Sequence, residues 1–132
     1  MFKWVRIVRR RIRRRPRPGI RARREGLLRY GEEARGLALS RLEYFNQFYN
    51  FKYGTVRIKA QTTRWGSCSS KGNLNFNYKM ALLPPHLVDY LVVHELCHLG
   101  EFNHSQNFWD LVGKTIPNYL ELRAELKSFK FH

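Results

Sequence analysis

Apolar residues recur at two different periods along this chain, and the change of period separates predicted helices from predicted strands. Between residues 26 and 50 they return every three or four positions, which predicts an amphipathic helix. Two glycines in this stretch weaken the helix without forbidding it. We expect the apolar stripe to face the core. Its members are Leu27, Tyr30, Ala34, Leu37, Ala38, Leu42, Phe45, Phe48 and Tyr49.

From Thr55 onward the period shortens to two. Apolar and polar residues alternate over residues 56–60 and again over 73–78, where asparagines separate Leu74, Phe76 and Tyr78. Strict alternation predicts half-buried strands, and the turn-forming residues before the second run predict a reversal of the chain. We therefore expect the two strands to be antiparallel neighbours in a small sheet.

The remainder of the chain has the pattern of helices. Pro84 and Pro85 suit the first turn of a helix, and the glycine and polar residues further on predict its end near residues 100–103. Ser105 is a candidate N-cap for the next helix, and Pro117 opens a last amphipathic segment. Together these elements predict an α+β domain with an N-terminal helix, a short sheet containing antiparallel strands, and C-terminal helices.

Charge divides the chain more sharply than hydropathy does. The net charge is +15, and residues 1–25 hold 12 Lys and Arg against Glu25 alone, whereas residues 26–132 hold 13 basic and nine acidic side chains. We expect a basic arm, or a shortened strand region, over residues 1–25 and a single domain over 26–132. Such an arm either contacts nucleic-acid phosphates through counterion release or is a solvated tail or edge strand.

Some classes of protein are disfavoured by composition. No apolar run is long enough for a membrane span, and no apolar stretch follows the basic N-terminus as a secretory signal requires. The two cysteines, Cys68 and Cys97, are too few for a disulfide framework and fit a reducing compartment. We expect a cytoplasmic protein.

The segment from His94 to His98 reads HELCH, an HExxH pattern inside a predicted helix. Residues four apart on a helix share a face, with Cβ atoms roughly 5–6 Å apart, so His94 and His98 can bind one Zn²⁺ ion. Glu95 lies beside this pair and is placed to act as general base on the attacking water. The motif therefore predicts a hydrolytic metal site.

A zinc site of this kind needs a third protein ligand. His104 is suitable if the chain turns back after the helix, and its spacing equals that of HExxHxxGxxH, although the glycine here stands at position 100 instead of 101. Glu101 and Cys68 are alternative ligands. Asn77, Arg64 and Tyr119 are candidate donors to the transition state.

Three blocks of this sequence resemble the YgjP-like metallopeptidases, a branch of the zincin-type proteases. They are RWGSCS at 64–69, GNLNFNYKM at 72–80 and PPHLVDYLVVHELCHLGEFNHSQNFW at 84–109, within a similarity that covers residues 40–120. The resemblance implies a small zincin-like fold in which His94, His98 and His104 bind zinc and Glu95 is catalytic. Relative to that family, the N-terminal region is shortened into the arginine-rich arm.

These observations favour a zinc-dependent metallopeptidase that cleaves peptide or protein substrates. An extended substrate is expected to lie on the strand edge around residues 74–78. The alternative is a non-catalytic zinc-stabilised module that docks on nucleic acid through residues 1–25. Glu95 argues against that alternative, because a purely structural zinc site has no need of a carboxylate at this position.

Overall fold

The computed structural model describes residues 19–129, so residues 1–18 of the predicted arm lie outside the described part of the chain. The predicted α+β class is confirmed, with one long helix, a small sheet and three further α-helices. The elements, in order, are α1 (Ile20–Asn46), β1 (Val56–Lys59), β2 (Gly66–Cys68), β3 (Leu74–Asn77), the 3-10 helix η2 (Tyr78–Leu82), α2 (Pro85–Cys97), α3 (Gln106–Thr115) and α4 (Tyr119–Ser128).

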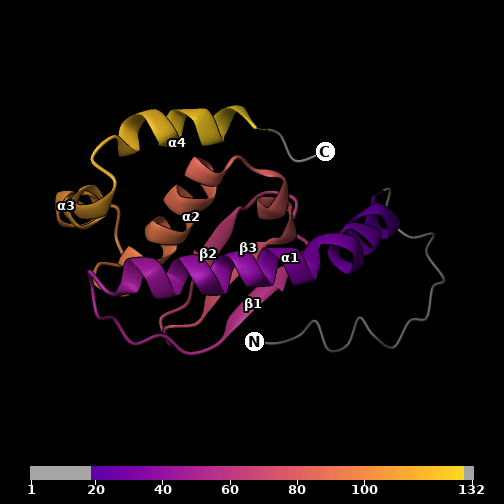
Figure 1. Cartoon of the computed structure of the whole chain (residues 1–132), viewed down its shortest axis with the longest axis horizontal. Coiled ribbons are helices and arrows are strands. Elements are labelled where there is room, and N and C mark those ends of the chain that lie inside the picture. Colours follow the sequence, from indigo (N-terminus) through magenta and orange to yellow (C-terminus); the bar gives the residue numbers. More distant parts are fainter. Residues whose placement is uncertain (1–18, 130–132) are drawn as a thin grey trace, which may run out of the picture.

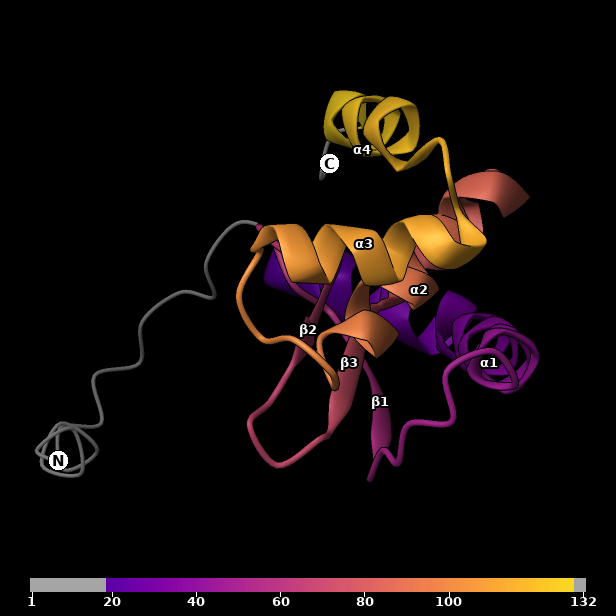
Figure 2. The same ribbon diagram turned by 90° about the vertical axis from the view of Figure 1, so that its left-hand side faces the viewer.

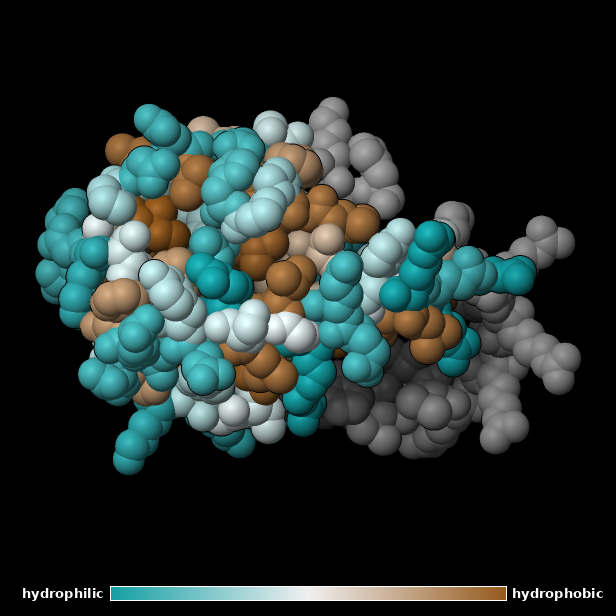
Figure 3. Space-filling view, in the orientation of Figure 1, coloured by the Kyte–Doolittle hydropathy of each residue, from teal (hydrophilic) through white to brown (hydrophobic). Residues whose placement is uncertain are grey.

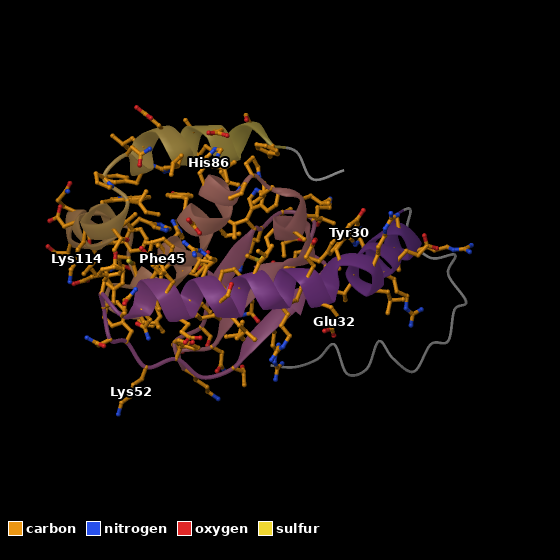
Figure 4. The ribbon with its side chains drawn as sticks, in the orientation of Figure 1. Tyr30, Glu32, Phe45, Lys52, His86 and Lys114 are labelled. Carbon is orange, nitrogen blue, oxygen red and sulfur yellow. The ribbon has the colours of Figure 1, made fainter. Side chains whose placement is uncertain are left out.

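Helix α1 forms where the stripe of period 3.6 predicts it, but with shifted ends. It begins at Ile20 and ends at Asn46, whereas the pattern predicted 26–50. The stripe is buried at four positions and Phe45 points from α1 toward α2 in Figure 4. The predicted core face of this helix is therefore confirmed over its second half, at Ala34, Ala38, Leu42 and Phe45.

The sheet has three strands in the order β1-β3-β2. Strands β1 and β3 pair in parallel, so the prediction that they are antiparallel neighbours is wrong. The turn residues 69–72 join β3 to β2 instead, and Gly72 occupies the left-handed region with φ 83° in that turn. Strand β2 is only three residues long, too short for an alternating pattern to show.

One face of the sheet carries the core. Val56, Leu74 and Phe76 are buried there and join a single apolar cluster with α1 and α2. Arg57 and Lys59 are exposed, as the alternation predicts. In Figure 1 helix α1 crosses in front of the strands, and Figure 2 shows α4 above α3, with α3 passing in front of α2 and the strands below. No helix in residues 19–129 is long and apolar enough to cross a membrane.

Helices α1 and α2 are held together by an ion pair as well as by apolar contact. Arg41 Nε donates to Asp89 Oδ1 at 2.6 Å, and Arg41 Nη2 donates to Asp89 Oδ2 at 3.1 Å, which makes a bidentate pair. A groove lined by Leu37, Leu83 and Val88 lies beside this pair. On the face shown in Figure 3, apolar side chains gather above α1 and hydrophilic ones surround them.

Helix α2 ends earlier than predicted, and this changes the path of the chain next to the histidines. The helix ends at Cys97, not near 100–103, and a turn follows in which the Gly100 and Glu101 amides both donate to the Cys97 carbonyl. A Cβ at Gly100 would lie 2.7 Å from the Phe51 ring, so any larger residue would require that ring to move. The chain therefore reverses immediately after the HExxH segment.

Asn77 is the one residue of β3 whose place contradicts the alternating pattern. It is fully buried, although polar residues of this strand were expected to face outward. Its amide nitrogen donates to the carbonyls of Gln61 and Arg64 at 3.0 and 2.9 Å, and its oxygen accepts from the Lys79 amide at 3.1 Å. Asn77 thus fixes the loop before β2 and caps η2.

We expect Asn77→Leu to lower the free energy of unfolding by about 3 kcal/mol, because it removes a fully buried amide that makes three hydrogen bonds to the main chain. The matched control is Asn75→Leu on the partly exposed face, where the amide makes one bond, to Ser67 Oγ at 3.2 Å. That change is expected to cost less than about 1 kcal/mol. Urea unfolding of both variants measures the difference, and equal losses would contradict the role of Asn77.

Candidate metal centre

Three histidine side chains meet at the C-terminal end of α2. His94 and His98 stand one helical turn apart, and His104 approaches them from the loop before α3. The Nε2 atom of His104 lies 3.1 Å from that of His98 and 3.3 Å from that of His94. The three possible ligand atoms all lie within 4.8 Å of one another, so one ion can contact all of them.

The donor set fits a tetrahedral metal ion. Zinc binds imidazole nitrogen at about 2.0–2.1 Å, which places two ligand nitrogens about 3.3 Å apart. Each neutral imidazole has only one N–H, and the Nδ1 atom of His98 lies 3.0 Å from the Glu101 carbonyl, where it donates that hydrogen. The Nε2 atom of His98 is then unprotonated, and its lone pair is available to a metal ion.

Burial keeps two of the histidines, His94 and His98, in the neutral form that a metal needs. Burial, followed by the neighbouring His98 and His104, lowers the pKa of His94 to about 3. Burial also lowers the pKa of His98, although its bond to the Glu101 carbonyl opposes this shift. Both rings are therefore unprotonated at neutral pH, so a metal ion does not have to displace a proton from them.

Aromatic rings pack behind the histidines and fix their positions. The Phe108 ring stacks on His98 with centroids 4.3 Å apart, and Phe108 is fully buried. Trp109 stacks on the exposed His104 at 5.9 Å, and Tyr119 stacks on Trp109 at 5.1 Å. These contacts support His104, the ligand that comes from a loop instead of a helix.

Glu95 is buried beside the histidines at the edge of a small cavity. The cavity measures about 200 Å³, and its walls include Arg64, Gly66, Tyr90, His94 and Leu126. Burial raises the pKa of Glu95 to about 8, and Arg64 partly opposes this shift. A Cβ at Gly66 would lie 3.0 Å from Glu95 Oε2, so the glycine lets β2 approach the carboxyl group.

The structure brings together the three histidines that the spacing predicts and leaves both alternative ligands out of the group. Among residues 19–129, the group that can hold a metal contains neither Cys68 nor Glu101. Glu101 contributes only its carbonyl, to His98. Cys97 is buried in the core, and His86 pairs with Glu125 at 2.8 Å beneath α4 (Figure 4).

The three candidate donors to the transition state have different positions. The Asn77 amide is already bonded to two carbonyls, so the candidacy of Asn77 is not supported. Tyr119 packs on Trp109, whereas Arg64 does line the cavity. The sequence analysis missed β2 and Gly66, and the only available signal was a glycine in a segment with no periodic pattern.

Comparisons with known proteins agree with this arrangement. A family model described as "YgjP-like, metallopeptidase domain" matches residues 9–129. The crystal structure of the metallopeptidase zymogen of Pyrococcus abyssi abylysin has a similar fold, with TM-score 0.62 and 24% identity, covering 70% of this chain and 96% of that one. The metallopeptidase zymogen of Methanocaldococcus jannaschii jannalysin gives 0.56 and 19%, covering 71% and 93%. No curated protein matches.

The buried carboxyl predicts how stability depends on pH in the metal-free protein. Because the pKa of Glu95 is raised from 4.5 to about 8 on folding, the folded state keeps a proton that the unfolded state releases. Stability is therefore lost as pH rises through this window, by about 1.4 kcal/mol per pH unit. Glu95→Gln removes this loss, so relative to wild type it should gain about 2–4 kcal/mol between pH 5 and pH 8.

Urea unfolding in the presence of a chelator at the two pH values measures this gain. Glu33→Gln, at an exposed position of α1, is the matched control and should show no pH-dependent gain. A constant difference between Glu95→Gln and wild type at both pH values would show that the carboxyl is ionised in the folded, metal-free protein.

Proposed function

This chain belongs to the YgjP-like metallopeptidase family, and on that premise we propose that it hydrolyses peptide bonds with a zinc ion held by His94, His98 and His104. The observation that carries the proposal is the convergence of three imidazole nitrogens, one of them from His94, which lines the same cavity as the buried carboxyl group of Glu95. Three protein ligands leave one position of a tetrahedral ion open, which is typical of catalytic zinc sites and not of structural ones.

Zinc is the metal that the donor set favours. Imidazole nitrogens suit Zn²⁺, and a site with three neutral ligands keeps the full charge of the ion available to the reaction. When bound, zinc supplies a Lewis acid that polarises the substrate carbonyl and lowers the pKa of the attacking water. The three histidines hold the ion, and the rings of Phe108 and Trp109 keep two of them in place.

Glu95 is the proposed general base. It adjoins the ligand His94 in sequence, lines the cavity, and has a pKa near neutrality in the metal-free protein. A cation nearby favours the carboxylate form, which can take a proton from the attacking water and pass it to the leaving amine. Burial keeps bulk water away from this exchange, because only 4% of Glu95 is exposed.

Strand β2 is the proposed platform for an extended substrate. Strand β3 lies between β1 and β2, so the edge expected around residues 74–78 does not exist. Trp65 and Ser69 bond to β3 through their main chains, so in an antiparallel pair the intervening Gly66 and Cys68 direct their N–H and C=O groups outward. A peptide that adds to this edge passes beside Glu95.

The alternative function, nucleic-acid binding by a zinc-stabilised module, has less support. Its arm lies mostly outside the described residues, and it requires a closed site with four ligands. In the described part of the chain, only three residues converge, and one of them, His94, also lines the cavity of Glu95. Binding through residues 1–18 therefore stays a prediction from the sequence.

The ligand set predicts a selective loss of metal. The wild-type chain should hold about one zinc ion, and His104→Ala should weaken zinc binding at least about 100-fold and lower the unfolding temperature of the zinc-loaded protein. The matched control is Glu101→Gln, since only the carbonyl of Glu101 contacts the site. Metal analysis and titration with a zinc indicator test this, and full zinc retention in His104→Ala would remove His104 from the ligand set.

If Glu95 is the general base, replacing it should lower the rate of peptide cleavage without loss of the metal. Glu95→Gln should keep its zinc and reduce peptide cleavage by about 10²- to 10⁴-fold, because general-base catalysis contributes about this much. Mass spectrometry of a peptide library incubated with each zinc-loaded protein measures cleavage. Equal rates in wild type and variant would rule out Glu95 as the base, and absence of cleavage in both would contradict the peptidase function.

A further inference from the structure

Two arginines lie near the cavity. Arg64 lines the cavity from the loop before β2. The guanidinium carbon of Arg123, on α4, lies 5.1 Å from the centroid of the Trp109 ring, which itself stacks on His104. Within residues 19–129 neither arginine forms an ion pair, whereas Arg21 and Arg41 do. Two cations thus stand near the metal centre with their charge available to a ligand.

The position of Arg64 is fixed by the fold. Its carbonyl accepts a hydrogen bond from the fully buried Asn77 at 2.9 Å, so the main chain is held while the side chain extends at the cavity. Arg64 acts electrostatically on Glu95, and Arg123 acts on His94 and Tyr90, which also line the cavity. The positive potential of both arginines therefore reaches the place where substrate must bind.

The sheet side of the site carries no negative charge of its own. Residues 44–88, which include all three strands and the loop of Arg64, contain no Asp or Glu but six Lys and Arg. In Figure 4 Lys52, which belongs to this stretch, extends away from the helices. In β2 and the segments that flank it, residues 60–73, the only charged residues are Arg64 and Lys71, a distribution that attracts an anion and repels a cation.

We propose that this site selects peptide substrates that carry a carboxylate within one or two residues of the scissile bond, and that Arg64 binds this carboxylate. The inference rests on the proposed peptidase function. A guanidinium binds a carboxylate through two parallel hydrogen bonds, which gives direction as well as charge. A cavity of about 200 Å³ accommodates one side chain or one chain end instead of a larger ligand.

The carboxylate has two possible sources, an Asp or Glu side chain and the C-terminal α-carboxylate of a short peptide. Three peptides of equal length separate them: a neutral peptide with an amidated end, its Asn→Asp counterpart with an amidated end, and the neutral peptide with a free C-terminus. We expect kcat/KM of the zinc-loaded full chain to be about 10- to 100-fold higher for at least one carboxylate peptide than for the neutral one. Because Arg64 is exposed, 0.5 M salt should reduce this ratio.

Variants at position 64 test the residue itself. Arg64→Gln should bring the ratio of acidic to neutral kcat/KM close to one, and Arg64→Glu should reverse it in favour of a lysine-containing peptide. The matched control is Arg57→Gln, which removes an exposed arginine from the outer face of β1 and should leave the ratio unchanged. An unchanged ratio in Arg64→Gln would overturn the role of Arg64.

A binding measurement separates this inference from the proposed function. Fluorescence anisotropy of the labelled Asp peptide with the chelator-treated full chain should show tighter binding than the neutral peptide, and Arg64→Gln should abolish the difference. Selective binding without any cleavage would contradict the peptidase function and retain the carboxylate site. Cleavage of acidic and neutral peptides at equal rates, or tight binding of an oligonucleotide without any acidic-peptide preference, would overturn the carboxylate site.

Discussion

The site depends on one steric constraint, the reversal of the chain at Gly100. A Cβ at this position would lie 2.7 Å from the Phe51 ring and 3.0 Å from the Leu111 side chain, so the turn is packed between the segment after α1 and helix α3. Asn46, at the end of α1, holds Phe51 through two hydrogen bonds to its main chain. The long N-terminal helix thus fixes the turn that brings His104 back to His94 and His98.

The groups gathered at this turn disfavour folding when no metal is present. Three imidazole nitrogens are held within 4.8 Å of one another, and a carboxyl group is buried beside them with a raised pKa. The apolar cluster that includes α1, α2, α3, α4 and the sheet must offset this cost. A bound cation lowers the cost of bringing the three imidazoles together, because their nitrogens coordinate it. It also lowers the cost of burying Glu95, because it favours the ionised carboxylate. Groups that contribute unfavourably to the free energy of folding are typical of functional positions.

The sequence predicts the parts of this molecule that depend on short-range spacing. The stripe on α1, the two alternating runs and the pair His94 and His98 all follow from the geometry of one element. The structure has a helix, two strands and a histidine pair at these places, although α1 has shifted ends and buries the stripe only over its second half. The parallel pairing of β1 and β3 was not predictable in this way, since alternation is the same for both directions of pairing. The prediction for Asn77 was wrong because an asparagine in an alternating run is compatible with a solvent-facing position and with a buried one that holds a loop. Only the distant loop at residues 61–64 decides between the two.

The residues of the metal centre lie close together in the sequence, whereas the residues proposed to select the substrate come from distant segments. The three histidines of the metal centre and the proposed general base, Glu95, fall within residues 94–104, and the rings that pack on them follow at once in α3, so one continuous segment supplies the metal centre. The wall opposite Glu95 comes from β2 and its preceding loop, and depends on the hairpin, on Gly66 and on Asn77. If substrate binds along β2 as proposed, changes in the sheet region can alter which peptide binds while the metal centre is preserved. A sheet of three strands is sufficient for the proposed arrangement, because only its β2 edge has to reach Glu95.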